Sequence, residues 1–159
     1  MVSETKSVKL DENSNNKRIM VELKIPSEFG YEKIAMSTVA TIASEFGFNE
    51  EKVEDIKTAV SEACINAIEH GNQMLESKNV LVLFRVTKDG LIIDVQDEGR
   101  TKGFKLVHSP DLENKMAGAS TKRGWGLFLI DKLVDDVKVI QDDDNASVLR
   151  MVIKLEQNK

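Results

Sequence analysis

Glu62 and Asn66 stand four residues apart in the stretch SEACINAIEHGN, residues 61–72. The pattern of this stretch indicates a helix, on which the two side chains lie next to each other on the face opposite the apolar one. A carboxylate can accept a proton, and an amide oxygen is a suitable ligand for a hard cation such as magnesium. Solvated helix faces often carry the same residue types, so both interpretations stay open on spacing alone.

Asp97 and Gly99 directly follow a run of β-forming residues in the stretch VQDEGR, residues 95–100. An aspartate at a strand end commonly just begins a turn, and a glycine commonly just permits it. The alternative is that the Asp97 carboxylate accepts hydrogen bonds from an adenine amino group, while Gly99 lets the backbone pass close to the base. These residues alone support either interpretation.

Gly124 and Gly126 lie at the predicted start of a helix in the stretch KRGWG, residues 122–126. The two glycines leave backbone N–H groups unobstructed, and the partial positive charge of a helix N-terminus favours phosphate. Lys122 and Arg123 add two cationic side chains. A glycine-rich entry turn that binds nothing has the same composition.

The hydrophobic pattern predicts the elements that position these residues. Alternating apolar residues predict strands, and apolar residues at helical spacing predict helices. The predicted strands are 18–25, 80–86, 91–95, 137–140 and 148–155, and the predicted helices are 31–46, 50–70 and 124–135. Residues 98–123 lack this periodicity and are predicted to form a lid over a site.

Glycine and asparagine mark the predicted ends of these elements. Gly47 and Gly71 should end the first two helices in the left-handed conformation, and Asn49 should cap the start of the second helix. The sequence KDG, which ends at Gly90, predicts a hairpin turn because glycine tolerates a positive φ.

Together these elements predict a single α/β domain built as a two-layer sandwich. A mixed, mainly antiparallel sheet should carry the three helices on one face. Residues 1–17 are polar and are predicted to be a flexible leader, whereas residues 18–157 form the domain. A chain of 159 residues with 41% hydrophobic residues can bury one core.

Composition narrows the classes of function. The 27 acidic and 22 basic residues give a net charge of -5, which disfavours direct binding to nucleic acid or to an anionic membrane. No N-terminal apolar stretch resembles a signal peptide or a membrane span, so a cytoplasmic protein is expected. The single cysteine, Cys64, excludes an intramolecular disulfide and lies on the apolar helix face. With only two histidines, a zinc site is not expected.

The three stretches resemble a family when they are taken together and in this order. The acid-plus-amide helix, the Asp-x-Gly after a hairpin strand and the Gly-x-Gly at a helix start resemble the N box and the two glycine boxes of the GHKL ATPases. That superfamily includes gyrase, a heat-shock chaperone, the histidine kinases and MutL. Within it, SEACINAIEHGN together with RGWGLFLI looks most like the anti-sigma-factor serine kinases of the RsbW and SpoIIAB type. The resemblance spans about residues 18–155.

The resemblance implies that the chain binds ATP with Mg2+. It makes Glu62 the general base and Asn66 the magnesium ligand. It places the remaining site residues around the nucleotide, with Asp97 on the adenine, Gly99 and Gly103 in the adenine-side loop, and Arg123, Gly124 and Gly126 near the phosphates. Gly103 stands later than a compact D-x-G-x-G pattern requires. Trp125 separates the two phosphate-side glycines and is large enough to pack under the lid or to face a partner.

The function implied by the resemblance is a serine/threonine protein kinase. It would phosphorylate a small anti-sigma antagonist of the STAS type, bind and inhibit a sigma factor, and form a homodimer. A second hypothesis is a non-catalytic module that senses ATP and sequesters a regulatory partner, against which Glu62 argues because a sensor needs no base. A third, the catalytic half of a two-component histidine kinase, is not expected because only a flexible leader precedes the domain.

Overall fold

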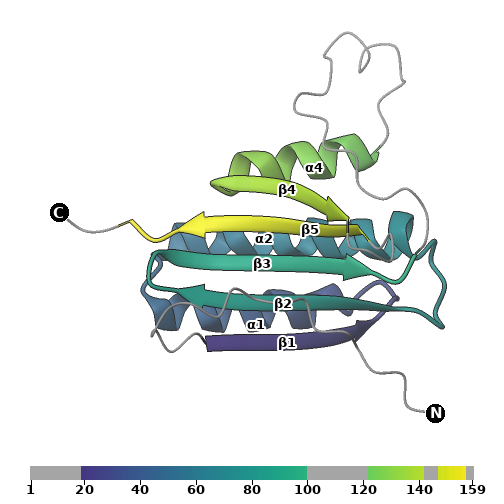
Figure 1. Cartoon of the computed structure of the whole chain (residues 1–159), viewed down its shortest axis with the longest axis horizontal. Helices are drawn as coiled ribbons and strands as arrows, with labels where there is room; N and C mark the ends of the chain where they lie inside the picture. The colour runs from purple at the N-terminus through teal and green to yellow at the C-terminus, as the bar shows by residue number, and fades with distance from the viewer. Residues whose placement is uncertain (1–18, 100–121, 142–146, 157–159) are drawn as a thin grey trace, which may run out of the picture.

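An antiparallel sheet forms one layer of the protein. The computed structural model of the chain describes residues 19–99, 122–141 and 147–156. In these ranges five strands run in the order β1-β2-β3-β5-β4 (Figure 1). The strands are β1 Ile19–Pro26, β2 Asn79–Thr87, β3 Gly90–Asp97, β4 Asp136–Gln141 and β5 Ser147–Lys154. The sequence prediction allowed a mixed sheet, whereas the described strands form antiparallel pairs only.

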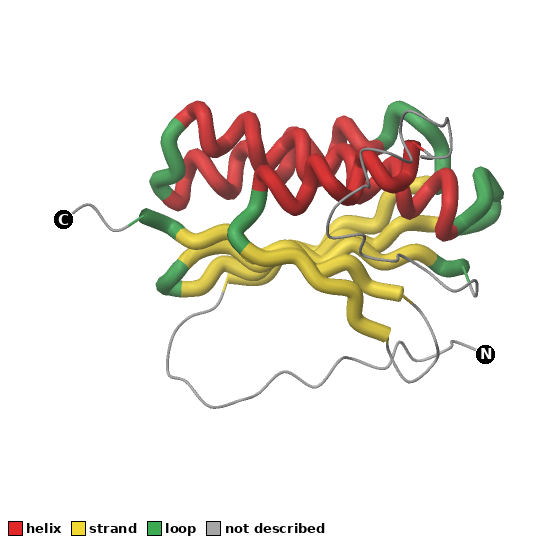
Figure 2. Tube along the Cα trace, turned by 90° about the horizontal axis from the view of Figure 1, so that it is seen from above, coloured by secondary structure: helices red, strands yellow, loops and turns green. Residues whose placement is uncertain are grey.

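The described helices form the second layer on one face of this sheet (Figure 2). They are α1 Glu32–Phe46, α2 Glu50–Asn66 and α4 Lys122–Leu133, and a π-helical turn, η1 Ala67–Gly71, directly continues α2. The predicted two-layer sandwich with helices on one face is therefore confirmed. In the described part of the chain, no helix is long and apolar enough to cross a bilayer.

The core lies between the two layers, because the strands present alternate residues to the helices. On β2 the buried residues are Val80, Val82, Phe84 and Val86, and on β5 they include Leu149, Met151 and Ile153. The apolar face of α2 packs onto them with Val53, Ile56, Val60 and Cys64, as its spacing predicts. Full burial of one such valine, leucine, isoleucine or phenylalanine side chain stabilises the fold by about 1.5–3 kcal/mol.

Local turn chemistry agrees with the prediction at three places. Gly47 ends α1 at a φ of 98°, and the Asn49 side chain caps α2 by accepting a hydrogen bond from Lys52 N at 2.8 Å. Gly90 turns the β2–β3 hairpin at a φ of 153°. A Cβ on Gly90 would also overlap the Ile153 carbonyl oxygen, so both backbone conformation and space require glycine there.

Two helix ends differ from the prediction. Gly71 was predicted to end the second helix in the left-handed conformation, but it lies inside the π turn and is not among the positive-φ glycines, which in the described chain are Gly30, Gly47 and Gly90. Helix α4 begins at Lys122, before the predicted start at Gly124. Most of the predicted lid, residues 100–121, lies outside the described residues.

An ion-pair cluster ties three strands together on the sheet face away from the helices. Asp94 alternates with the core residues Ile93 and Val95 and therefore points to the opposite face. Its carboxylate accepts hydrogen bonds from Arg150 Nε at 2.7 Å and Arg150 Nη2 at 2.8 Å, and it also pairs with Arg85. The hydrogen bonds to Asp94 raise the pKa of Arg150. The cluster joins β2, β3 and β5, so it holds the strand that leads to Asp97.

We expect Asp94→Ala to lower the free energy of unfolding by about 3 kcal/mol, because it removes the carboxylate that two largely buried guanidinium groups contact. Urea denaturation measures the loss. The matched control is Glu54→Ala, which breaks an exposed pair with Lys57 and should cost less than about 0.5 kcal/mol. Equal losses in the two variants would contradict the structural role of the cluster.

Candidate active site

Helix α2 lies between α1 and α4 on the sheet (Figure 1). The two ends of α4 are both held against it. At the C-terminal end of α4, Lys52 Nζ donates a hydrogen bond to the carbonyl oxygen of Leu133 at 3.0 Å. A cation at this end also complements the helix dipole. At the other end, the first turn of α4 packs on the C-terminal half of α2, where the predicted catalytic residues lie.

Gly126, the fifth residue of α4, brings the N-terminal half of this helix into direct contact with the acid-plus-amide pair. A Cβ added to Gly126 would lie 2.9 Å from Glu62 Oε2 and 3.1 Å from Asn66 Nδ2. Any larger residue would therefore displace one of these side chains. The structure thus brings together three predicted site residues, Glu62, Asn66 and Gly126, from two separate stretches of the sequence.

The burial of Asn66 distinguishes the two interpretations of this helix face. Asn66 is only 3% exposed and Glu62 is half-buried, so the pair is not an ordinary solvated face. Among the described residues, Asn66 Nδ2 has no hydrogen-bond partner. Buried amide groups normally have one, and an exception calls for an explanation such as a ligand or ion. The amide is therefore suited to contact a bound group at this position.

Asp97 and Gly99 form the second part of the site, at the end of β3. Asp97 is only 2% exposed, and its Oδ1 accepts a hydrogen bond from Gly99 N at 2.8 Å. That bond is the turn interaction expected of an aspartate at a strand end. A Cβ on Gly99 would overlap the carbonyl oxygen of Gly71, and a Cβ on Gly71 would overlap the Asp97 carboxylate. The π turn and the end of β3 therefore touch directly, and glycine is required on both sides of the contact.

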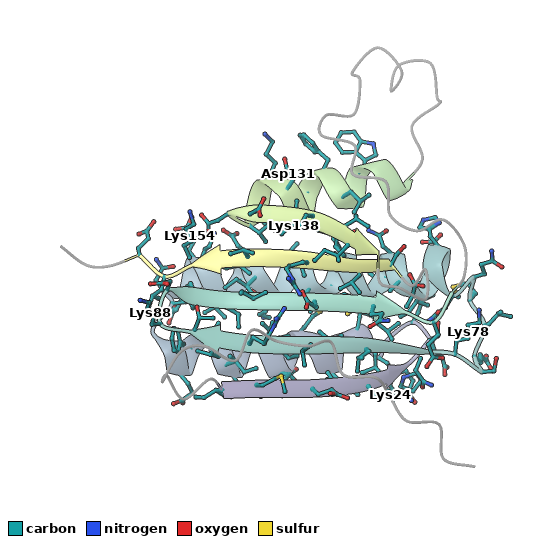
Figure 3. The ribbon with its side chains drawn as sticks, viewed as in Figure 1. Lys24, Lys78, Lys88, Asp131, Lys138 and Lys154 are labelled. Carbon is teal, nitrogen blue, oxygen red and sulfur yellow. The ribbon has the colours of Figure 1, made fainter. Side chains whose placement is uncertain are left out.

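The physical reason for Gly71 is thus a tertiary contact and not a helix stop. The π turn begins one residue after Asn66 and ends at Gly71, so a single turn joins the two parts of the site. Such one-turn π segments occur frequently at functional sites. The end of β3 that contacts the π turn lies at the Lys78 end of the sheet, where β2 begins (Figure 3). Lys88 marks the opposite end, at the β2–β3 hairpin.

The remaining predicted site residues are only partly described. Lys122, Arg123 and Gly124 lie in the first turn of α4. The N-terminus of this helix, whose first backbone N–H groups have no partner within the helix itself, is therefore at the same end of α4 as the contact with Glu62 and Asn66. Gly103 lies outside the described residues.

Three other residues received an interpretation from the sequence. Cys64 is fully buried, and burial, with the nearby Glu32, raises the pKa of its thiol to about 12, so it is a protonated core residue at neutral pH. His70 lies in the π turn, with Nε2 3.9 Å from a Glu69 carboxylate oxygen. Trp125 is 47% exposed and its ring stands edge-on to the Phe128 ring, with centroids 6.0 Å apart.

Asn72 and Glu98 are the residues near the site that were not predicted. Asn72 is fully buried and Glu98 directly follows Asp97, and the Asn72 side chain bonds to the backbone of Glu98. Asparagine is common in loops, so nothing in the residue type indicated this contact. Its only signal is its position as the last residue of the stretch 61–72, which contains Glu62 and Asn66.

Comparison with known families identifies the class of this fold and site. The profile described as histidine kinase-like ATPase domain matches residues 25–153. A crystal structure of the RsbU and RsbW domains of a Mycobacterium tuberculosis protein has the same fold, with a TM-score of 0.62 at 15% identity, over 88% of this chain and 33% of that chain. The protein is therefore built on a histidine kinase-like ATPase domain.

Curated relatives give a narrower assignment. The serine-protein kinase RsbW of Bacillus mycoides (strain KBAB4) is 32% identical over 140 residues, which are 86% of this chain and 87% of that relative. The serine-protein kinase RsbW of Bacillus velezensis is 35% identical over 122 residues, which are 75% and 76% of the two chains. The chain belongs to the RsbW family of serine-protein kinases.

We expect Gly71→Ala to weaken ATP binding by about tenfold or more, because the new Cβ must push the Asp97 carboxylate away from its position. Titration calorimetry measures the affinity. Gly47→Ala is the matched control, since an added Cβ there meets nothing within 4 Å and only the positive φ is strained. Both variants should lose about 1–3 kcal/mol of stability. A similar loss of affinity in both would show that the Gly71 contact has no specific role.

Proposed function

We propose that this chain is a cytoplasmic serine/threonine protein kinase that uses Mg-ATP to phosphorylate an anti-sigma antagonist of the STAS type, and that it sequesters a sigma factor. The observation that carries the proposal is the contact of Gly126 with Glu62 and Asn66. It sets a proton acceptor and an amide beside the first turn of a helix. Membership of a family of serine-protein kinases supports the same reaction.

Phosphoryl transfer requires mainly positioning and charge stabilisation, together with a group that takes the proton of the attacking hydroxyl. Glu62 has that role in the proposal, because its carboxylate is half-buried and lies against Gly126. The backbone N–H groups in the first turn of α4, from Lys122 to Gly124, bind phosphate oxygens. Asp97 binds the adenine amino group, and Gly71 and Gly99 keep the surrounding backbone close.

Asn66 is the residue that would hold magnesium. Its amide is buried, and an amide oxygen suits a hard cation. Nδ2, which has no hydrogen-bond partner among the described residues, is a donor and suits a phosphate oxygen instead of the metal. When bound, magnesium neutralises phosphate charge in this kind of reaction. The residues present therefore fit the metal that the family implies.

The proposal includes a homodimer as the working form of the kinase, on the basis of the resemblance to the RsbW and SpoIIAB type. It does not include direct binding to nucleic acid, because the net charge of -5 repels a phosphate backbone. Binding experiments with candidate sigma factors and antagonists test the two proposed partner interactions.

We expect Glu62→Gln to lower the rate of phosphate transfer by about 10²–10⁴-fold, because the amide cannot take the hydroxyl proton. Its affinity for ATP should stay within about threefold of wild type, since size and shape are kept. Transfer of labelled phosphate from ATP to candidate antagonist proteins measures the rate. Glu69→Gln is the matched control in the neighbouring π turn and should retain activity.

The same assay separates the kinase from a non-catalytic module. Magnesium-dependent ATP binding by the wild-type protein, without transfer to any antagonist of the STAS type, would support the module that senses ATP. Transfer at the wild-type rate by Glu62→Gln would remove Glu62 from the role of general base.

We expect Asn66→Ala to weaken ATP binding by about tenfold or more in the presence of magnesium, because the substitution removes the proposed metal ligand. In excess chelator the variant and the wild type should bind ATP with similar, weaker affinity. The matched control is Asn49→Ala, which removes an asparagine from the other end of the same helix. It should cost about 1 kcal/mol of stability without changing the magnesium dependence. An unchanged magnesium dependence in Asn66→Ala would contradict the assignment.

A further inference from the structure

We propose that Asn72 is a positioning residue for adenine recognition, acting through the backbone that carries Asp97. This inference rests on the proposed ATP-binding function and deepens it. In this proposal, discrimination between adenine and guanine depends on the bond between the Asn72 side chain and the Glu98 backbone, although Asn72 itself does not contact the nucleotide.

The Asn72 side chain joins two strand ends. Its Oδ1 accepts a hydrogen bond from Glu98 N at 2.8 Å, and its Nδ2 donates one to the Asn79 carbonyl oxygen at 2.9 Å. The Glu98 side chain completes a ring, because its Oε2 accepts a hydrogen bond from Asn79 N at 2.9 Å. Asn72 is fully buried, so its own two bonds are partly shielded from water, whereas the bond between Glu98 and Asn79 is exposed.

The register of the sheet shows that the Asn72 side chain takes the place of one backbone pair between β2 and β3. Val80 pairs with Asp97, so a ladder continued by one residue would set Asn79 opposite Glu98. There the Glu98 N–H would bond directly to the Asn79 carbonyl in an antiparallel ladder. Instead, the Asn72 amide stands between these two groups and satisfies both of them. The side chain therefore takes the place of a backbone pair and separates β3 from β2 directly after Asp97.

Only an amide of this length does both tasks. The position needs one acceptor for Glu98 N and one donor for the Asn79 carbonyl, and an asparagine side chain supplies both from a single planar group. A carboxylate has no donor, and an alanine would leave the part-buried Glu98 N–H and Asn79 carbonyl without this partner. The residue type is thus dictated by the two backbone groups that it joins.

The ring holds the backbone directly after Asp97. Asn72 follows Gly71, Glu98 follows Asp97, and the Asn72–Glu98 bond runs beside the contact between Gly71 and the Asp97 carboxylate. Gly99, one residue further, donates its N–H to Asp97 Oδ1. The backbone is therefore held at the two residues that directly follow Asp97, while the carboxylate itself lies against Gly71. A displacement of about 1 Å at such a group can cost about 100-fold in rate or affinity.

The test compares ATP and GTP binding by wild type and by Asn72→Ala. Titration of each nucleotide in magnesium gives the ratio of the two dissociation constants. We expect wild type to prefer ATP, and Asn72→Ala to lose about tenfold or more of that preference, while the rate of phosphate transfer at saturating ATP changes less than threefold. A merely destabilising substitution would not change the ratio. Val82→Ala, in the core on β2, is the control for lost stability.

The exposed Glu98 provides variants that test the same ring without disturbing the core. Glu98→Ala removes the acceptor for Asn79 N and should lower the ATP preference severalfold, whereas Glu98→Gln keeps an acceptor and should retain it. If Asn72→Ala does not fold, the comparison of Glu98→Ala with Glu98→Gln tests the inference instead. The inference is overturned if Asn72→Ala keeps the wild-type ratio of the ATP and GTP dissociation constants. If Asn72→Ala does not fold, a wild-type ratio in Glu98→Ala overturns it. Failure of the wild-type protein to bind ATP is a different result, which overturns the proposed function instead.

Discussion

The candidate site depends on segments that approach so closely that an added Cβ would overlap its neighbours at Gly71 and Gly99 and would crowd two side chains at Gly126. Gly126 lies against Glu62 and Asn66, Gly71 lies against the Asp97 carboxylate, and Gly99 lies against the carbonyl of Gly71. These contacts link the N-terminal half of α4 to the end of α2, and the π turn that continues α2 to the end of β3. None of the three glycines has a positive φ, so space and not backbone conformation selects glycine at each position.

The rest of the fold keeps these contacts in register. The alternating core residues fix β3 between β2 and β5, and the Arg85–Asp94–Arg150 cluster joins the same three strands from the other face. On the helical layer, the Lys52 side chain holds the far end of α4. Because these interactions lie away from the site, the strand and helix ends that form it are presented by elements that are already rigid.

The sequence predicted the parts of this architecture that depend on local chemistry. Strand alternation, the glycine turns at Gly47 and Gly90, and the cap at Asn49 all follow from a few neighbouring residues. The prediction for Gly71 was wrong and Asn72 received none, because their roles come from contacts with Asp97, Asn79 and Glu98. A glycine after a helix looks the same in the sequence whether it turns the chain or makes room for a carboxylate. The burial of Asn66 likewise requires α4, more than fifty residues further along the chain.

Electrostatics constrain how the proposed triphosphate is bound. Glu62 is a proton acceptor only when it is ionised, and two like unit charges about 4 Å apart repel by about 4 kcal/mol at an effective dielectric constant of about 20. The N-terminus of α4 offsets only part of this, since a helix end contributes about 0.3–1 kcal/mol. The buried Asn66 is neutral, so it adds a ligand without adding repulsion. In the proposed kinase, a carboxylate base can therefore stand beside phosphate only if cations balance the charge, so a bound magnesium ion would strengthen nucleotide binding at this site.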